Sequence, residues 1–396
     1  MLDASVLAYF ADDTTRTYQL VQWLPVLEQL AEHQPVGVVA RDPQAAALLR
    51  TRTSLPVALA ESFPELTELY AVVDPKVVLY VNNSMLNFQS LLDTRKLHVH
   101  INHGESDKQS MASNNAKAYD RVFVAGEAAV QRHLATLLEF DTGRLVRIGR
   151  PQLDLRPEPI LAPSERRTVL YAPTWEGDAA YNDYTSVETV GAEIVAAALA
   201  VPHVRLVYKP HPKITTSHTP AIRAAHRRIL DLVAGADRAE PASGHRSVVG
   251  GDILALLPDC DAMITDVSSV GLDWLYLRTD RPIFVTDRHQ DADRLRQEVP
   301  VSRCADVIAA HGAASDRSVP LAERALVAEL TGLIAARLDH DEHHLARVAM
   351  RHHYFGDLEI GESTTRFIEE VASLVILRDH LLGVGTSHPA TDAIIA

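Results

Sequence analysis

Short apolar runs alternate along the chain with longer segments in which apolar positions recur every three to four residues. The short runs are typical of strands buried on both faces, and the longer segments of helices with one apolar side. Strands are predicted at 6–10, 36–40, 56–58, 76–81, 96–101, 121–124, 145–148, 168–172, 204–208, 261–265 and 282–285. Helices are predicted at 18–32, 43–50, 86–92, 127–138, 188–199, 219–234, 269–277, 321–337 and 364–376.

This alternation predicts an α/β protein with parallel sheets that carry helices on both faces. A proline-rich stretch at 151–166 interrupts it once, and a chain of 396 residues suits two domains. We therefore expect one domain at 1–155, a second at 165–380 and a loose tail at 381–396. Loops that face a shared edge predict a cleft between the domains as the ligand site.

Composition narrows the class of protein. Hydrophobic residues make up 47% of the chain and charged residues 23%, so a substantial core can form. The net charge of −14 argues against a nucleic-acid partner. Two cysteines, Cys260 and Cys304, provide neither a zinc pattern nor a disulfide framework and indicate a cytoplasmic location. With no signal peptide or long apolar span expected, any membrane contact would be peripheral.

Four polar segments follow predicted strands, at the sheet edge where ligands bind in open α/β folds. One of them, Thr265-Asp266-Val267-Ser268-Ser269, leads directly into an apolar helix. The first N–H groups of that helix and its dipole form a ready anion site, although an ordinary N-cap would look the same. The other three segments are Asn102-His103-Gly104, Tyr171-Ala172-Pro173-Thr174-Trp175 and Tyr208-Lys209-Pro210-His211-Pro212.

The order of these elements resembles the CDP-glycerol glycerophosphotransferase family, the teichoic-acid and capsule polymerases. The resemblance covers roughly residues 95–375. It rests on His103-Gly104 with Lys108 downstream, Ala172-Pro173-Thr174-Trp175, Lys209-Pro210-His211-Pro212, Thr265 to Ser269 with Asp273 and Pro282, and Gly361-Glu362-Ser363-Thr364-Thr365-Arg366. It implies the GT-B architecture of two Rossmann-like domains.

The chain departs from the family pattern at two elements. Val267 stands where the family usually has Tyr. Asn102 replaces the Trp that usually precedes the His-Gly pair, and Glu105-Ser106 replace the Thr-Pro that usually follow it. The second departure lies in the domain that holds the acceptor, so the nature of the acceptor stays open.

The resemblance also implies roles for individual side chains. His103 is the candidate general base, because a neutral imidazole can accept a proton at cellular pH, and Gly104 would let the backbone approach a phosphate. His211 and Lys209 would stabilise the donor pyrophosphate from the side opposite Ser268 and Ser269. The remaining donor-binding candidates are Thr174, Thr265, Asp266 and Asp273.

Each of these roles has a plainer alternative. His103 could be a strand-end histidine that only forms a hydrogen bond, and the two prolines around His211 could make a rigid surface turn. Asp273 would bind ribose hydroxyls, or else interact with the helix dipole. Asp266 is expected to support its turn rather than to react. His98 and His100 are interpreted as core residues, so neither a metal site nor a cofactor is predicted.

The expected function is transfer of a glycerol-phosphate, or related polyol-phosphate, from CDP-glycerol or another CDP-polyol. The acceptor would be a hydroxyl of a cell-wall or capsule polymer or of its lipid-linked precursor, at the inner face of the cell membrane. One alternative is a GT-B glycosyltransferase or epimerase that uses a UDP-sugar. Another is a non-catalytic nucleotide-binding scaffold, against which the intact His103 and His211 argue.

Overall fold

The computed structural model describes residues 2–310 and 320–384. By their internal contacts, the residues form two compact units. Unit 1 comprises Met1–Gly104, Ala112–Leu155 and Asp357–Ala396, and unit 2 comprises Glu105–Met111 and Arg156–Gly356. This division differs from the expected one in two places, since 105–111 belongs to unit 2 and the chain after Gly356 returns to unit 1. Of the expected tail, residues 385–396 lie outside the described part.

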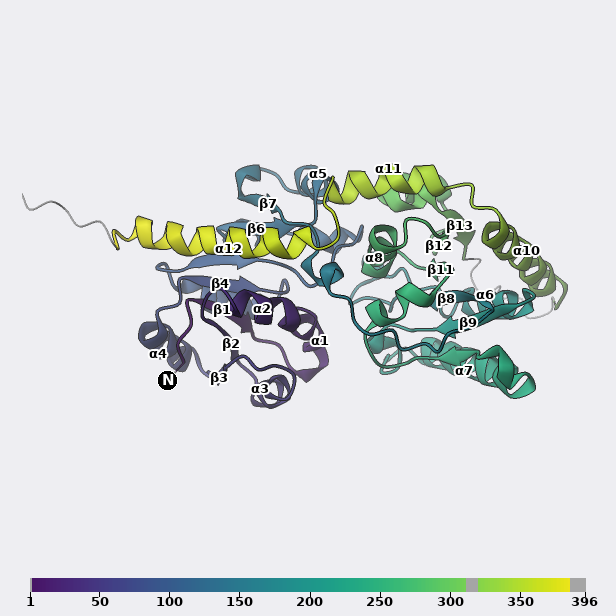
Figure 1. Ribbon diagram of the computed structural model, residues 1–396, viewed down its shortest axis with the longest axis horizontal. Helices are drawn as coiled ribbons and strands as arrows, with labels where there is room; N and C mark the ends of the chain where they lie inside the picture. Colours follow the sequence, from purple (N-terminus) through teal and green to yellow (C-terminus); the bar gives the residue numbers. More distant parts are fainter. Residues whose placement is uncertain (1, 311–319, 385–396) are drawn as a thin grey trace, which may run out of the picture. The chain divides into compact units, whose positions relative to one another are not determined.

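Unit 1 contains a parallel sheet in the order β3-β2-β1-β4-β5-β6-β7 (Figure 1). The order reverses between β1 and β4, which is the position where open α/β sheets bind ligands. The strands are β1 (Val6–Phe10), β2 (Val36–Ala40), β3 (Val57–Leu59), β4 (Val77–Tyr80), β5 (Leu97–His100), β6 (Arg121–Val124) and β7 (Leu145–Arg147).

Helices cover both faces of this sheet. On one face α2 (Leu24–Ala31), α3 (Pro43–Arg50) and α12 (Glu362–Leu381) share a core with the strands. On the other, α4 (Phe63–Val73) and α5 (Glu127–Thr136) share a second core. The short α1 (Tyr18–Val21) precedes α2.

The start of α12 is fixed to unit 1 by a carboxylate. Asp154, in the 3-10 turn η6 (Pro151–Asp154), accepts hydrogen bonds from the backbone N–H groups of Gly361 at 2.7 Å and Thr364 at 2.6 Å. A carboxylate at a helix N-terminus satisfies N–H groups that lack partners within the helix and also interacts favourably with the dipole. The closing Gly361–Arg366 element therefore has a structural role in unit 1.

Unit 2 repeats the strand order of unit 1, as β10-β9-β8-β11-β12-β13, with every pairing parallel. The strands are β8 (Arg167–Ala172), β9 (Val204–Tyr208), β10 (Arg246–Ser247), β11 (Ala262–Thr265), β12 (Ile283–Asp287) and β13 (Asp306–Ala309). The helices are α6 (Gly191–Ala200), α7 (Pro220–Ala239), α8 (Ser269–Leu277), α9 (Ala292–Glu298), α10 (Pro320–Asp339) and α11 (His344–Phe355). Here the order reverses between β8 and β11.

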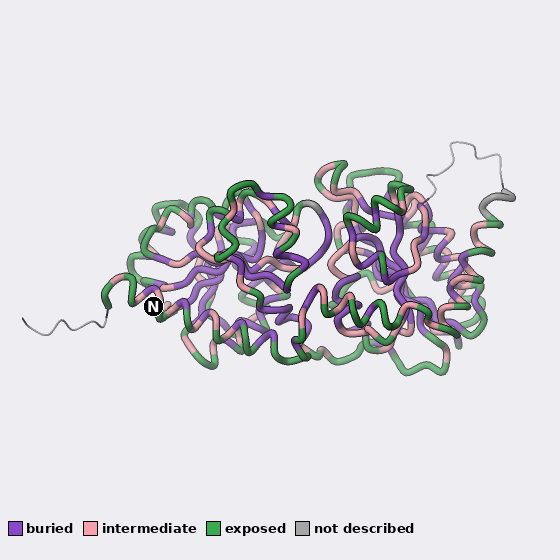
Figure 2. Tube along the Cα trace, turned by 90° about the horizontal axis from the view of Figure 1, so that it is seen from above, coloured by how far each residue is buried: buried purple, intermediate pink, exposed green. Residues whose placement is uncertain are grey.

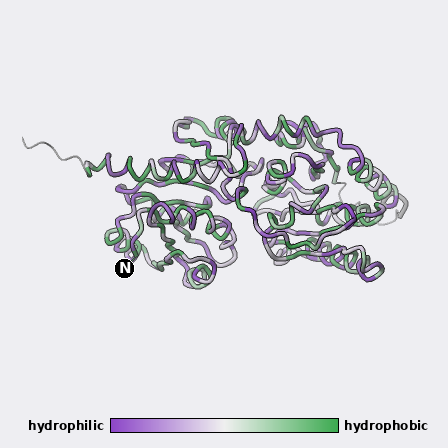
Figure 3. The backbone as a smooth tube through the Cα atoms, in the orientation of Figure 1, coloured by the Kyte–Doolittle hydropathy of each residue, from purple (hydrophilic) through white to green (hydrophobic). Residues whose placement is uncertain are grey.

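The uninterrupted apolar runs predicted as strands are the buried centres of the two sheets. Every residue of β1, β2, β4, β9, β11 and β12 is buried. Figure 2 shows these segments in purple inside each unit, and Figure 3 shows the apolar stretches that form them. Two parallel sheets covered by helices confirm the predicted α/β class.

Every predicted strand is present, but the element predictions err in specific ways. The segment 86–92 is a 3-10 helix, η2 (Met85–Leu92), with Asn87 and Ser90 buried on it. The helix expected at 18–32 is divided into α1 and α2. The strands β10 and β13 and the helices α4, α9 and α11 were not predicted. Across 2–310 and 320–384, no helix is both long enough and apolar enough to span a bilayer.

Candidate active site

In unit 2, a buried carboxylate connects the loops at the point where the strand order reverses. Asp266 follows β11 and is 1% exposed. Its Oδ2 accepts hydrogen bonds from the backbone N–H groups of Thr174 at 2.7 Å and Ser186 at 3.3 Å, and its Oδ1 accepts one from the Thr286 hydroxyl at 2.5 Å. Burial raises the pKa of the Asp266 carboxyl to about 6, while these hydrogen bonds act against that shift. Asp266 thereby holds the loop after β8 against the ends of β11 and β12.

The loops after β8 and β9 are joined by backbone hydrogen bonds. The N–H of Lys209 donates to the carbonyl of Tyr171 at 2.9 Å, and the N–H of His211 donates to the carbonyl of Pro173 at 3.1 Å. Lys209 is buried, and this burial lowers the pKa of its ammonium group. Thr174, Lys209 and His211 are thus brought together at one edge of the unit 2 sheet.

The ring of His211 is oriented by its neighbours. It stacks on Trp175 with ring centroids 6.0 Å apart and 27° between the planes, and the ammonium of Lys213 lies 3.7 Å from the centre of the same indole. The backbone N–H of Lys213 donates to Nδ1 of His211 at 3.2 Å. Because Nδ1 accepts, the neutral ring carries its hydrogen on Nε2. His211 can therefore present an N–H donor to an anion.

The helix α8 begins at Ser269, as predicted, with Ser268 in the N-cap position. The Ser268 side chain makes no capping bond to this helix; its hydroxyl instead bonds to that of Thr265 at 3.2 Å. Since the Thr265 hydroxyl donates to the Ala172 carbonyl at 2.8 Å, the Ser268 hydroxyl is the donor in their bond. The first N–H groups of α8, which have no acceptor within the helix, are therefore left uncapped by Ser268. Asp273 is buried one turn further along α8.

Lys108 adds a cation to this site that the residue predictions did not include. It lies in the 105–111 segment of unit 2. Its Nζ donates to the Thr174 hydroxyl at 3.2 Å and lies 5.8 Å from the centre of the Tyr184 ring. Burial lowers the pKa of the Lys108 ammonium to about 8, and the carboxylates of Asp266 and Asp183 oppose that shift. The only sequence signal for Lys108 was its position downstream of the His-Gly pair.

In unit 1, His103 lies beyond β5 on a turn fixed by Asn102. Asn102 adopts φ +50°, in the left-handed region that Asn tolerates better than most residues. Its side-chain oxygen accepts from the N–H of His103 at 2.8 Å, and its carbonyl accepts from the indole N–H of buried Trp23. Asn is therefore well suited to this turn, where the family usually has Trp. Gly104 is the last residue of unit 1 before the chain enters unit 2.

The imidazole of His103 has the opposite tautomer to that of His211. Its Nδ1 lies 3.3 Å from the carbonyl oxygen of Val81, just after β4, and its ring meets Tyr18 edge-on at 6.1 Å. A carbonyl oxygen only accepts hydrogen bonds, so Nδ1 carries the hydrogen and the neutral ring has its lone pair on Nε2. This tautomer is the one required of a base that acts through Nε2.

A buried polar cluster occupies the reversal point of the unit 1 sheet, and the sequence analysis did not identify it. Asn82, after β4, donates through Nδ2 to Asp12 Oδ2 and to Gln19 Oε1, both at 2.8 Å. Asp12, after β1, also accepts from the Ser84 hydroxyl at 3.2 Å. Ser84 itself caps η2 by accepting from the N–H of Leu86 at 3.3 Å. Single polar residues after a strand give no pattern by which this cluster could have been found.

His98 and His100 are core residues, as interpreted from the sequence. Both are buried on β5. Nδ1 of His98 bonds to the Tyr80 hydroxyl at 2.8 Å, and the His100 ring lies 5.0 Å from that of Tyr119. Burial lowers the pKa of His100 to about 3. In the described part of the chain, no group of three or more His, Cys, Asp or Glu side chains is arranged to hold a metal ion.

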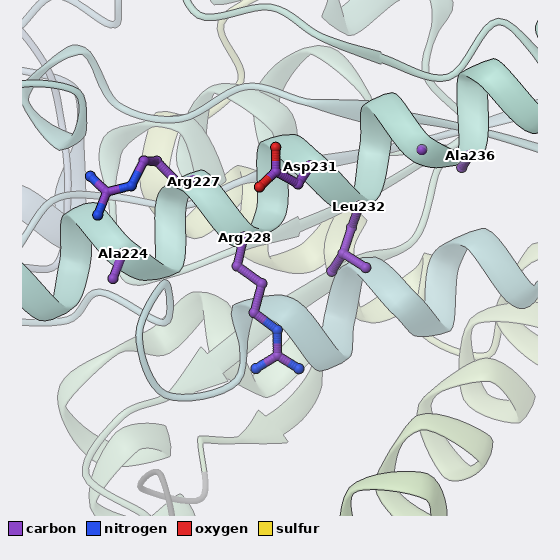
Figure 4. A pocket seen from close by; sticks show the side chains of 7 residues that line it. Ala224, Arg227, Arg228, Asp231, Leu232 and Ala236 are labelled. Carbon is purple, nitrogen blue, oxygen red and sulfur yellow. The ribbon is translucent and has the colours of Figure 1, made fainter.

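A depression on the surface of unit 2 lies away from these residues. Its lining comes entirely from α7 and contains Ala224, Arg227, Arg228, Asp231, Leu232, Gly235 and Ala236 (Figure 4). Arg227, Arg228 and Asp231 are exposed. A hollow between the side chains of one helix does not enclose a ligand, and none of the predicted site residues contributes to it.

Comparison with known proteins places the sequence of this chain in a family. The model of the family described as CDP-glycerol:poly(glycerophosphate) glycerophosphotransferase matches residues 92–297, which include all the predicted site residues. A search of curated protein sequences finds no match.

Solved structures with the same fold come from more than one class of enzyme. The wall teichoic acid polymerase TagF aligns with a TM-score of 0.55 at 11% identity, over 94% of this chain and 90% of that one. S. aureus MnaA, in a structure with UDP, aligns with a TM-score of 0.57 at 14% identity, over 97% and 98%. A glycosyltransferase from Rickettsia africae aligns with a TM-score of 0.55 at 11% identity, over 95% and 99%. These similarities confirm the predicted GT-B fold.

Proposed function

The chain belongs to the CDP-glycerol:poly(glycerophosphate) glycerophosphotransferase family, and we propose that it transfers glycerol phosphate from CDP-glycerol to a hydroxyl acceptor. Membership supports a transferase that acts on an activated polyol phosphate. TagF, whose structure was determined after a soak with CDPG, shares the fold. The acceptor is proposed to be a hydroxyl of a cell-wall polymer or of its lipid-linked precursor.

The observation that carries this proposal is the collection of groups suited to an anion at one edge of the unit 2 sheet. At the reversal point between β8 and β11, the start of α8 is left uncapped by the Ser268 side chain. The same edge carries buried Lys209 and the oriented N–H of His211. A pyrophosphate needs several N–H donors and positive charge in a partly dehydrated site, because charge-assisted hydrogen bonds are stronger there.

The proposed reaction moves one phosphoryl group. An acceptor hydroxyl oxygen attacks the phosphorus that bears glycerol, and the bond from that phosphorus to the bridging oxygen of CMP breaks. CMP departs with the electron pair, and the hydroxyl proton moves to His103 Nε2. The catalytic demand is mainly to position the reactants and to stabilise the charge on the departing phosphate.

We propose that the two imidazoles have different roles, which follow from their tautomers. His211, with Nδ1 occupied by the Lys213 N–H, donates from Nε2 to a pyrophosphate oxygen. His103, with Nδ1 directed to the Val81 carbonyl, accepts the proton at Nε2. Thr174, Ser268 and Ser269 contact the donor phosphates, and Asp273 contacts ribose. Asp266 and Thr265 position these groups through the hydrogen bonds described above.

The reaction is proposed to take place in the cytoplasm, at the inner face of the cell membrane. The acceptor is a polymer or its lipid-linked precursor, so its reactive end has to be near that surface. Cys260 and Cys304 are buried free thiols, as expected in a reducing compartment.

One assay separates the proposed function from its alternatives. The protein is incubated with CDP-glycerol, CDP-ribitol or a UDP-sugar, with and without a hydroxyl acceptor, and release of CMP or UDP is followed. Release of CMP that depends on the acceptor supports the proposal. Release of UDP, or epimerisation of the sugar, would establish a sugar-nucleotide enzyme instead. Binding of nucleotide with no turnover of any donor would establish a scaffold.

A further inference from the structure

Lys108 is a buried cation that lacks a negatively charged partner in direct contact. The residue is 8% exposed and belongs to unit 2. Its Nζ makes one hydrogen bond, to the neutral hydroxyl of Thr174 at 3.2 Å. Over residues 2–310 and 320–384, no carboxylate lies within ion-pair distance of this ammonium. An ammonium group can donate three hydrogen bonds, so two of its donors remain available.

Two carboxylates, Asp266 and Asp183, act on the pKa of Lys108 through their charge, and both are bonded to other groups. Asp266 accepts from Thr174, Ser186 and Thr286. Asp183 forms an ion pair with Arg288 at 2.9 Å. Burying a charge without pairing it is unfavourable, and the lowered pKa of Lys108 reflects that cost. A fold stabilised only by its own contacts would gain from an apolar side chain at this position.

Several contacts hold the 105–111 segment in unit 2 and so fix the position of Lys108. The Tyr354 hydroxyl, at the end of α11, donates to the carboxylate of Asp107 and accepts from the N–H of Val301 at 3.1 Å. The Ser110 hydroxyl donates to the side-chain oxygen of Asn182 at 3.4 Å. Lys108 lies between these attachments, so its ammonium is placed by the fold rather than left on a mobile arm.

The contacts of Lys108 connect it to the candidate anion site at the start of α8. Thr174, which accepts its hydrogen bond, is held through its backbone by Asp266, and Ser268 follows Asp266 by two residues. We propose that Lys108 binds a phosphate of the nucleotide donor. Its ammonium, which has no carboxylate partner in the described part of the chain, would pair with a phosphate oxygen. This proposal rests on the function proposed above and adds a charged contact to the donor site.

The test compares Lys108→Met, which keeps the length and removes the charge, with Lys108→Arg, which keeps the charge. Lys117→Met is the matched control, because Lys117 is exposed on unit 1. Calorimetric titration measures the binding of CDP-glycerol, inorganic pyrophosphate and cytidine to each protein. Thermal unfolding is followed without ligand. Cytidine reports the shape of the nucleoside pocket, and pyrophosphate reports the anion site alone.

For Lys108→Met we expect CDP-glycerol and pyrophosphate to bind roughly 10- to 100-fold more weakly, with cytidine affinity unchanged. We also expect the unfolding midpoint to rise by about 2 °C or more, because an uncompensated buried charge is gone. Lys108→Arg should recover part of the anion affinity, and Lys117→Met should behave as wild type. A variant that unfolds at lower temperature and binds cytidine more weakly would show a structural lysine and overturn the proposal.

The outcomes for the wild type separate the two proposals. If it binds CDP-glycerol and Lys108→Met binds it equally well, the role of Lys108 is wrong and the proposed function stands. If it binds pyrophosphate through Lys108 but neither binds nor turns over CDP-glycerol, the anion contact stands and the proposed donor is wrong. If it binds neither compound, Lys108 is no phosphate ligand.

Discussion

Both units place a carboxylate where the strand order of the sheet reverses, Asp12 after β1 in unit 1 and Asp266 after β11 in unit 2. Asp12 accepts hydrogen bonds from the side chains of Asn82 and Ser84. Asp266 accepts two of its three from backbone N–H groups. A side chain can rotate to a new partner when a carboxylate is lost, but a backbone N–H cannot.

The serines after β4 and β11 differ in whether they cap the helix that follows. Ser84 caps η2 with its hydroxyl, whereas Ser268 turns its hydroxyl to Thr265 and makes no side-chain cap on α8. In unit 1 the polar groups at the reversal point bond to one another. In unit 2 the Ser268 hydroxyl leaves the start of α8 without a side-chain cap, and Lys108 bonds to Thr174 in the loop that Asp266 holds. Two sheets of the same strand order thus differ in which groups their loop serines bond to.

The largest expected effects concern the two imidazoles. His103→Ala should lower kcat roughly 10²- to 10⁴-fold, because a general base is lost. His211→Ala should lower kcat roughly 10²- to 10³-fold and should also weaken pyrophosphate binding, because an N–H group that donates a hydrogen bond to the anion is lost. Steady-state CMP release measures the first effect and titration with pyrophosphate the second. His33→Ala and His218→Ala, at exposed positions in units 1 and 2, are controls. Near wild-type turnover of folded His103→Ala would refute its role as base.

The two carboxylates provide the next test. Asp266→Ala should lower the free energy of unfolding by about 2–3 kcal/mol, because the backbone N–H groups of Thr174 and Ser186 lose their acceptor. Asp12→Ala should lower it by about 1 kcal/mol or less, because the side chains of Asn82 and Ser84 can reorient. Urea unfolding of both variants measures the difference. Equal losses would remove the distinction between backbone and side-chain donors.

Lys108 predicts a dependence of stability on pH. Its folded pKa of about 8 lies below the ordinary 10.5, so between these values the unfolded chain binds more protons than the folded one. Stability from this residue should therefore rise with pH across that window, by about 3 kcal/mol in total. The difference in unfolding free energy between wild type and Lys108→Met, measured from pH 7 to 10.5, should shrink accordingly. A constant difference would contradict the lowered pKa.

The smallest expected effect separates the two serines. Ser84→Ala should cost about 1 kcal/mol of stability, because η2 loses its cap. Ser268→Ala should cost only a few tenths of a kcal/mol, because this hydroxyl does not cap α8. Chemical denaturation of the two variants gives the comparison. Equal costs would mean that Ser268 stabilises α8 in a way that its hydrogen bonds do not indicate.

Much of this architecture could be predicted from the sequence because buried parallel strands have an unambiguous pattern. The run at 6–10 is apolar throughout, the run at 261–265 has an apolar centre at 262–264, and both end in polar turns, so both their type and their edge were clear. The start of α8 at Ser269 was predicted for the same reason. In contrast, β10 has two residues and β13 is only partly buried, so neither has an apolar run to detect.

The candidate site was predictable only where its residues form segments. Thr174, His211 and Asp266 belong to motifs, and the structure places them at one sheet edge. Asp12 and Asn82 stand alone in the sequence, 70 positions apart, and meet only because β1 and β4 are neighbours. Lys108 was noted as part of a motif, but its place in unit 2 depends on a hydrogen bond between Asp107 and Tyr354, two residues that are distant from each other in the chain.

The chain passes between the units at Gly104–Glu105, Met111–Ala112, Leu155–Arg156 and Gly356–Asp357. A hybrid gene joined once, after Leu155, would take 105–111 from one parent and Thr174 from the other. Lys108 and Thr174, which contact each other, would then come from different parents. Chimaeras that are meant to exchange acceptor preference should instead retain 105–111 from the parent that supplies 156–356. Unit 2 is therefore inherited as two separate segments, 105–111 and 156–356. Recombination at a single junction between these segments would combine parts of unit 2 from different parents.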